Sequence, residues 1–113
     1  MMKMLIQLDE ERVVRERKYK LSDMWRAIDA KFEKYHCTKE RQADGAVLYS
    51  GTQGNDYFTC INLAYLSLKR QKWFAEYCTK WIWYDNDDDE ELPLQDLDVL
   101  IRERQDNPLF ARA

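Results

Sequence analysis

The chain has 113 residues, with 18 lysines and arginines against 21 aspartates and glutamates, so its formal net charge is −3. This length fits one domain, and 45% hydrophobic and 13% aromatic residues are enough to build a core without disulfides or metals. Because no apolar run approaches the ~18–20 residues of a membrane span, and glycine and proline are scarce, membrane, collagenous and fully disordered chains are excluded.

The N-terminal third predicts a strand followed by helices. Residues 4–8 are a short apolar run ended by acidic residues, which is typical of a buried strand. The charged segment 9–19 predicts one or two peripheral helical turns capped by Asp9. Ser22 is a good N-cap for a longer helix at about 23–36, where apolar residues recur every three or four positions. These residues are Met24, Trp25, Ile28, Phe32 and Tyr35.

The middle of the chain predicts a loop, a strand and one ambiguous segment. Residues 38–45 are polar and read as a loop, and 46–49 read as a second strand. Residues 57–70 have helical spacing, yet the odd positions from Tyr57 to Leu63 alternate as in a strand. We favour the helix because the apolar run is longer than a usual strand, and the strand stays as the alternative. The helical set is Phe58, Ile61, Tyr65 and Leu68.

The C-terminal third predicts a strand and a last helix. Residues 73–78 either extend the preceding helix or form a short one of their own. Residues 80–84 are rich in β-formers and predict a third strand. Pro93 suits the first turn of a last helix, which should end near residue 105. The sequence therefore predicts a single α+β domain in which strands and helices alternate as β-α-β-α-β-α.

The predicted domain covers residues 1–105, and residues 106–113 are expected to be a C-terminal tail. Its sheet should be small, with three strands covered by helices.

Two observations on the cysteines indicate their redox state and the compartment of the protein. The three cysteines, Cys37, Cys60 and Cys78, are widely spaced, and no export signal precedes them. We therefore expect reduced, mostly buried thiols and a cytoplasmic protein.

Several stretches together resemble a known group of proteins. They are the runs 4–11 and 18–21, the run Leu-Lys-Arg-Gln-Lys-Trp-Phe at 68–74, and Trp-Ile-Trp-Tyr-Asp at 81–85. The chain resembles a group of small bacterial proteins of unknown function from gut anaerobes, often found in mobile-element neighbourhoods. The resemblance implies a bacterial cytoplasmic setting and a small accessory role. It transfers no catalytic residue.

Charge is distributed unevenly along the chain. Residues 1–84 carry a net charge of +4, and residues 85–113 carry −7. Such a split predicts that the acidic end lies near the basic body or meets a basic partner. The acidic block 85–91 fails as a calcium loop, because Glu90 stands where the sharp turn needs glycine. We read it as a solvated acidic loop; weak divalent binding and mimicry of nucleic-acid phosphates are the alternatives.

Aromatic side chains are concentrated just before this block, at Trp73, Phe74, Tyr77, Trp81, Trp83 and Tyr84. We expect Trp73, Phe74 and Trp81 in the core. Tryptophan and tyrosine are enriched at binding hot spots, and flanking carboxylates steer a basic partner. The sequence therefore predicts a partner-binding patch. Its residues are Trp83, Tyr84, Asp85, Asp87 and Asp88.

No combination of residues predicts catalysis or a bound cofactor. His36 is the one histidine, no C-x-x-C pair suggests a metal site, and neither a phosphate loop nor a nucleophile elbow is present. We therefore expect a non-catalytic interaction or accessory (immunity-like) factor that binds another protein, with a basic partner or a homodimer as the forms of contact. The rival function is nucleic-acid binding through the basic segment 12–20, which interleaved glutamates make less favourable.

Overall fold

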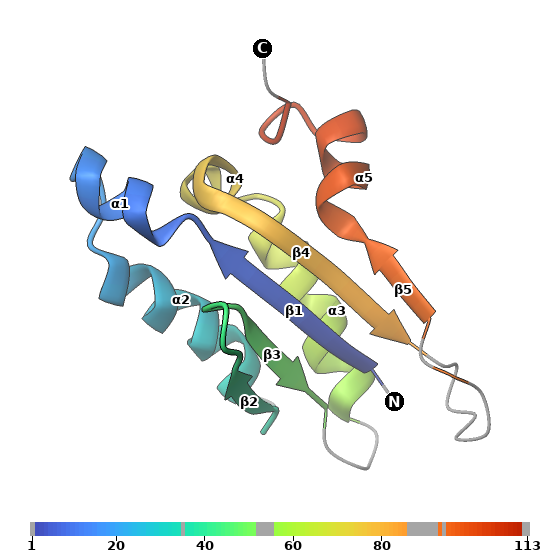
Figure 1. Cartoon of the computed structure of the whole chain (residues 1–113). Coiled ribbons are helices and arrows are strands. Elements are labelled where there is room, and N and C mark those ends of the chain that lie inside the picture. Colours follow the sequence, from blue (N-terminus) through green and yellow to red (C-terminus); the bar gives the residue numbers. More distant parts are fainter. Residues whose placement is uncertain (1, 35, 52–55, 86–92, 94, 112–113) are drawn as a thin grey trace.

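The computed structural model describes residues 2–34, 36–51, 56–85, 93 and 95–111. Five strands form one antiparallel sheet in the spatial order β2-β3-β1-β4-β5, with the longest strands in the middle (Figure 1). The elements in chain order are β1 (Met2–Leu8), α1 (Glu10–Glu16), α2 (Leu21–Glu33), β2 (Thr38–Arg41), β3 (Val47–Ser50), α3 (Asp56–Leu68), α4 (Lys72–Tyr77), β4 (Cys78–Asp85), β5 (Gln95–Asp98) and α5 (Val99–Asp106).

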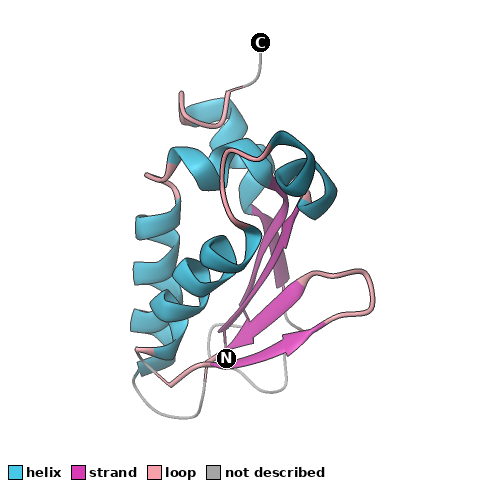
Figure 2. Cartoon of the chain, turned by 90° about the vertical axis from the view of Figure 1, so that its left-hand side faces the viewer, coloured by secondary structure: helices cyan, strands magenta, loops and turns pink. Residues whose placement is uncertain are grey.

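The two faces of the sheet have different environments. Along β1 the even-numbered residues are buried and the odd-numbered ones are half-buried, as expected for a strand covered on one side. Figure 2 shows the long helices on one side of the sheet, one further helix beyond the upper ends of the strands, and the loop between β2 and β3 on the other side. We call the helix-free side the open face.

The covered face forms one core with α2 and α3. Helix α2 turns Met24, Ile28 and Phe32 inward, as the spacing of three and four predicts. The ring of Phe32 stacks on Tyr49 of β3 at a centroid distance of 3.9 Å. The Tyr49 hydroxyl donates a 2.6 Å hydrogen bond to Asp29, which also pairs with Lys39 of β2. Helix, central sheet and edge strand are therefore joined at one place.

The main predicted elements are present. Residues 4–8 lie in β1 and 80–84 in the neighbouring β4, paired over their length. The ambiguous segment 57–70 is helical, as α3, and the strand alternative was wrong. Residues 73–78 are divided between the short helix α4 and the start of β4. The expectation of one α+β domain is confirmed.

The predicted three-stranded sheet was too small, because both edge strands were missed. Residues 38–41 were expected in a loop but form β2, and residues 95–98 were expected in the last helix but form β5. All four residues of each strand are exposed, so neither strand carries the alternation of buried and exposed residues that marks a strand in sequence. The last helix begins at Val99, after Asp98 accepts a hydrogen bond from the Ile101 amide as N-cap.

The end of the chain contributes to the core. Residues 106–113 were assigned to a tail, but Phe110 is only 2% exposed. Its ring lies 5.8 Å from Trp81 and 6.3 Å from Phe74. Within the described part of the chain, no helix has the length and apolar character needed to cross a membrane.

The cysteines also differ from the expectation of three reduced thiols. Cys37, just after α2, and Cys60, on α3, form a disulfide across 23 positions of sequence. Cys78 lies outside this pair and is buried. The sequence could not show the pairing, because it depends on how α2 and α3 pack. His36 beside Cys37 is exposed and has a positive φ of 61°.

Candidate partner-binding surface

The predicted patch begins on β4. The pleat of that strand places the two aromatic residues of the patch, Trp83 and Tyr84, on opposite faces of the sheet. Trp81 and Trp83 face the helices, whereas Ile82 and Tyr84 face the open side. Trp81 is fully buried and its indole Nε1–H lies 3.1 Å from the sulfur of Met4. The core assignment of Trp81 and Phe74 is confirmed, and Trp73 is partly buried against the same core.

Trp83 lies where the core meets the surface. It is partly buried, and its ring centroid is 5.6 Å from that of Tyr65 on α3. On the neighbouring strand its partner in register is Leu97, which is 43% exposed. One side of Trp83 therefore packs inward, while β5 beside it presents an exposed apolar side chain.

A hollow of about 460 Å³ lies at this end of the sheet. A smaller space of about 110 Å³ continues it toward Tyr65 and Val99. Two carboxylates and one guanidinium belong to the lining of the larger hollow, so acidic groups predominate. The lining residues are Trp83, Asp85, Gln95, Asp96, Leu97 and Arg102. We call this region the β5 surface.

Helix α5 is held in place by a buried carboxylate. Glu103 is 5% exposed and accepts a 3.1 Å hydrogen bond from the Tyr65 hydroxyl. Burial and this carboxylate raise the pKa of Tyr65 above its ordinary value, so the hydroxyl stays protonated as the donor. Asn107 donates to both Glu103 and the carbonyl of Lys69. These bonds join α5 to α3 and so position Arg102 beside Trp83.

The other predicted site residues are divided between places. Tyr84 points to the open face, where it lines a different hollow with Lys3 and Leu5. Asp85 lies at the end of β4, on the β5 surface. Asp87 and Asp88 fall outside the described residues. The structure thus brings Trp83 and Asp85 together and places Tyr84 on the opposite face of the strand.

Sequence reasoning missed Gln95, Asp96 and Leu97 as surface residues because Pro93 suggested that the last helix begins before them. One signal could have located them. Asp98 has the residue type of an N-cap, and starting the helix after it leaves residues 95–98 outside the helix.

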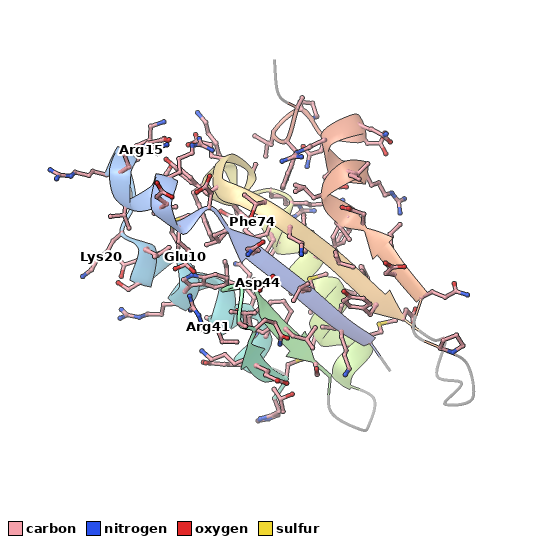
Figure 3. All side chains as sticks on the ribbon, viewed as in Figure 1. Glu10, Arg15, Lys20, Arg41, Asp44 and Phe74 are labelled. Atoms are coloured by element: carbon pink, nitrogen blue, oxygen red, sulfur yellow. A yellow bond between two sulfur atoms is a disulfide. The ribbon has the colours of Figure 1, made fainter. Side chains whose placement is uncertain are left out.

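The basic segment 12–20 is largely paired with carboxylates. Arg12 pairs with Glu16 at 2.5 Å and Arg15 with Glu11 at 3.9 Å, while Lys18 lies 3.6 Å from Glu76. Arg12 also donates to the carbonyl of Glu76 and lies over the ring of Tyr77. The segment therefore serves to attach α1 to α4. Figure 3 shows Arg15 and Lys20 at the outer end of this region.

Chemical groups for metal binding do not converge in the part of the chain that the structure describes: no group of three or more histidine, cysteine, aspartate or glutamate side chains comes together there. The hollows described above are lined by aromatic, aliphatic and charged side chains without a nucleophile paired to a base. Searches for similar proteins found no matching family model, no matching curated protein and no matching solved structure.

Proposed function

We propose that the protein is a non-catalytic accessory factor, of the kind that immunity-like proteins represent, which binds a basic, extended segment of another protein along β5. One observation carries the proposal. All four residues of the edge strand β5 are exposed, and the strand adjoins a hollow that Trp83, Leu97 and two carboxylates line. Among the described strands, only β4 pairs with β5, so its outer edge is available for backbone hydrogen bonds.

An extended peptide can add to such an edge as a further strand. Main-chain hydrogen bonds then supply affinity, and pockets for alternate side chains supply specificity. The hollow beside Trp83 and Leu97 can receive one side chain of the added strand. Arginine fits it best, because its stem packs on leucine and its guanidinium stacks on tryptophan.

Charge explains why the added strand should be basic and should come from another protein. Asp96 and Asp98 lie on β5, and residues 85–113 carry a net charge of −7. Two copies of this chain that paired β5 to β5 would place like charges together, which is a common way to protect a strand edge. A basic segment is not repelled in this way, because the acidic residues 85–113 attract it from a distance.

The alternative, nucleic-acid binding through 12–20, has less support. Arg12, Arg15 and Lys18 each pair with a carboxylate, and a phosphate would have to displace those partners. The bacterial cytoplasmic setting remains part of the proposal. There the glutathione and thioredoxin systems would hold Cys37 and Cys60 as a neighbouring pair of thiols that oxidation joins.

A synthetic peptide of alternating arginine and valine tests the proposal directly. We expect it to bind, to weaken with added salt and to shift the amide resonances of residues 95–98 in NMR spectra. Leu97→Ala should weaken binding about 5- to 30-fold, which corresponds to ~1–2 kcal/mol for a hot-spot truncation. Val14→Ala is the matched control, because Val14 is an exposed aliphatic residue on α1.

A peptide with glutamate in place of arginine should not bind. The proposal fails if the basic peptide leaves residues 95–98 unshifted, or if Leu97→Ala and Val14→Ala bind it equally. Binding of labelled DNA and RNA is measured in the same series of experiments. Tight, salt-sensitive nucleic-acid binding that is lost in Arg15→Ala and Arg17→Ala would instead establish the alternative.

A further inference from the structure

The open face of the sheet is a second surface, separate from the outer edge of β5. Its centre is an apolar row across three strands, since Leu5 pairs in register with Leu48 on one side and Ile82 on the other. All three are half-buried although no described helix packs on this face (Figure 2). Tyr84 lies next to the row, opposite Lys3.

Charged side chains surround the apolar row in a regular arrangement. The row ends in carboxylates at both sheet edges, because Glu40 pairs with Leu48 and Asp98 pairs with Ile82. Lysines lie at the two ends in the strand direction. Lys3 is two residues before Leu5, and Lys80 lies opposite Gln7, two residues after it. Cations therefore mark one axis of the face and anions mark the axis perpendicular to it.

We propose that this face binds a second copy of the chain, with the two sheets packed face to face at roughly a right angle. A quarter turn places the lysine axis of one sheet over the carboxylate axis of the other. In a twofold dimer each such contact occurs twice, because the same patch is used by both copies. Near-orthogonal sheet packing is one of the two common arrangements of packed sheets.

The dimensions of the two axes agree well enough for this pairing. Four residues along β1 span ~13 Å, and the four strand spacings from β2 to β5 span ~19 Å. The backbone of Lys3 lies ~7 Å from that of Leu5 along the strand, and the backbones of the edge carboxylates lie ~10 Å from it across the sheet. Both side chains are long enough to cover the difference. Lys80 lies 4.0 Å from Asp44 in the single chain, an exposed pair that costs little to exchange.

The charge balance of the face favours a second copy over other occupants. Lys3 and Lys80 stand against Glu40, Asp44, Asp96 and Asp98, so the face carries both signs with a net charge of −2. A nucleic acid would be repelled by it, whereas a second copy supplies both signs in the matching pattern. Asp98 can take part while capping α5, since the carboxylate has a second oxygen.

The area of the face sets the expected affinity. The five strands contain 27 residues and offer about 430 Å² per copy, from the ordinary strand spacing and rise. Stable complexes bury ~800 Å² per partner. The dimer should therefore be weak and should be visible as a concentration-dependent equilibrium.

Two variants of opposite charge test the proposal by sedimentation velocity over a range of concentrations. The first carries Lys3→Glu and Lys80→Glu, and the second carries Glu40→Lys and Asp96→Lys. We expect the wild-type chain to dimerise, each variant alone to stay monomeric, and an equal mixture of the two to form heterodimers. Lys31→Glu with Lys72→Glu, on the helix side, is the control and should dimerise like the wild type.

Circular dichroism checks that every variant is folded. A wild-type chain that is monomeric at all concentrations overturns the proposal. So do variants that dimerise alone as the wild type does, or a mixture that stays monomeric. The result of this test does not decide whether a peptide binds along β5. That proposal is tested by Leu97→Ala, which leaves the charges of the open face unchanged.

Discussion

At the level of single side chains, Phe110 contacts two aromatic rings of the core. It lies beyond α5, in a turn that Asn107 stabilises by accepting a hydrogen bond from the Leu109 amide. Its neighbour Leu109 is 45% exposed, so two adjacent apolar residues have opposite environments. Residues 109–113, which follow Pro108, show no periodic pattern that would separate the two.

Phe110→Ala should lower the free energy of unfolding by about 3–5 kcal/mol, the usual cost of removing a buried aromatic ring. Leu109→Ala should change it by less than about 0.5 kcal/mol, as is usual for an exposed position. Urea unfolding followed by tryptophan fluorescence measures both. Equal, small effects would mean that Phe110 is not part of the core.

At the level of elements, α1 is attached to α4 mainly by polar contacts. Val13 is its buried residue, while Val14 is 63% exposed. Arg12 and the Tyr77 hydroxyl both donate hydrogen bonds to Glu16. These bonds, the one from Arg12 first, lower the pKa of Glu16 below its ordinary value. The attachment should therefore depend on pH.

A carboxylate with a lowered pKa in the folded state stabilises the fold at neutral pH, and this contribution is lost as the pH falls through the folded-state pKa. Arg12→Ala should therefore lower the urea midpoint at neutral pH and differ less from the wild type in acid. Arg15→Ala is the control, because its pair with Glu11 is exposed and long. A constant difference between Arg12→Ala and wild type at every pH would contradict this.

At the level of the whole molecule, the disulfide joins the segment after α2 to the middle of α3. Cys37 and Cys60 enclose 23 positions of sequence, including β2, β3 and the start of α3. A crosslink across such a loop restricts the unfolded chain.

Oxidised protein should be about 3 kcal/mol more stable than reduced protein, from the loop-closure entropy of this length. Denatured oxidised protein should show one reactive thiol, Cys78, and reduced protein should show three. In Cys37→Ala the stability should no longer respond to reductant. Three thiols in protein purified without reductant, together with a stability unaffected by oxidant, would show that the pair does not bond in solution.

The two candidate surfaces show which of their features a local sequence pattern can predict. The alternation of side chains along a strand places Trp83 and Tyr84 on opposite faces of β4, and the aromatic cluster directed attention to the strand that carries both surfaces. Neither feature could show that Leu97 lies beside Trp83. That neighbour comes from β5, whose place is decided by pairing with β4.

The sequence by itself determined the elements with a buried face, namely β1, β3, β4, α2 and α3, because burial leaves a pattern of apolar residues in the sequence. Tertiary structure alone decided three other features. The edge strands β2 and β5 bury no side chain, so their pairing depends on the backbone of the neighbouring strand and leaves no apolar pattern. The Cys37–Cys60 pair and the burial of Phe110 likewise depend on which distant segments meet, which no local spacing records.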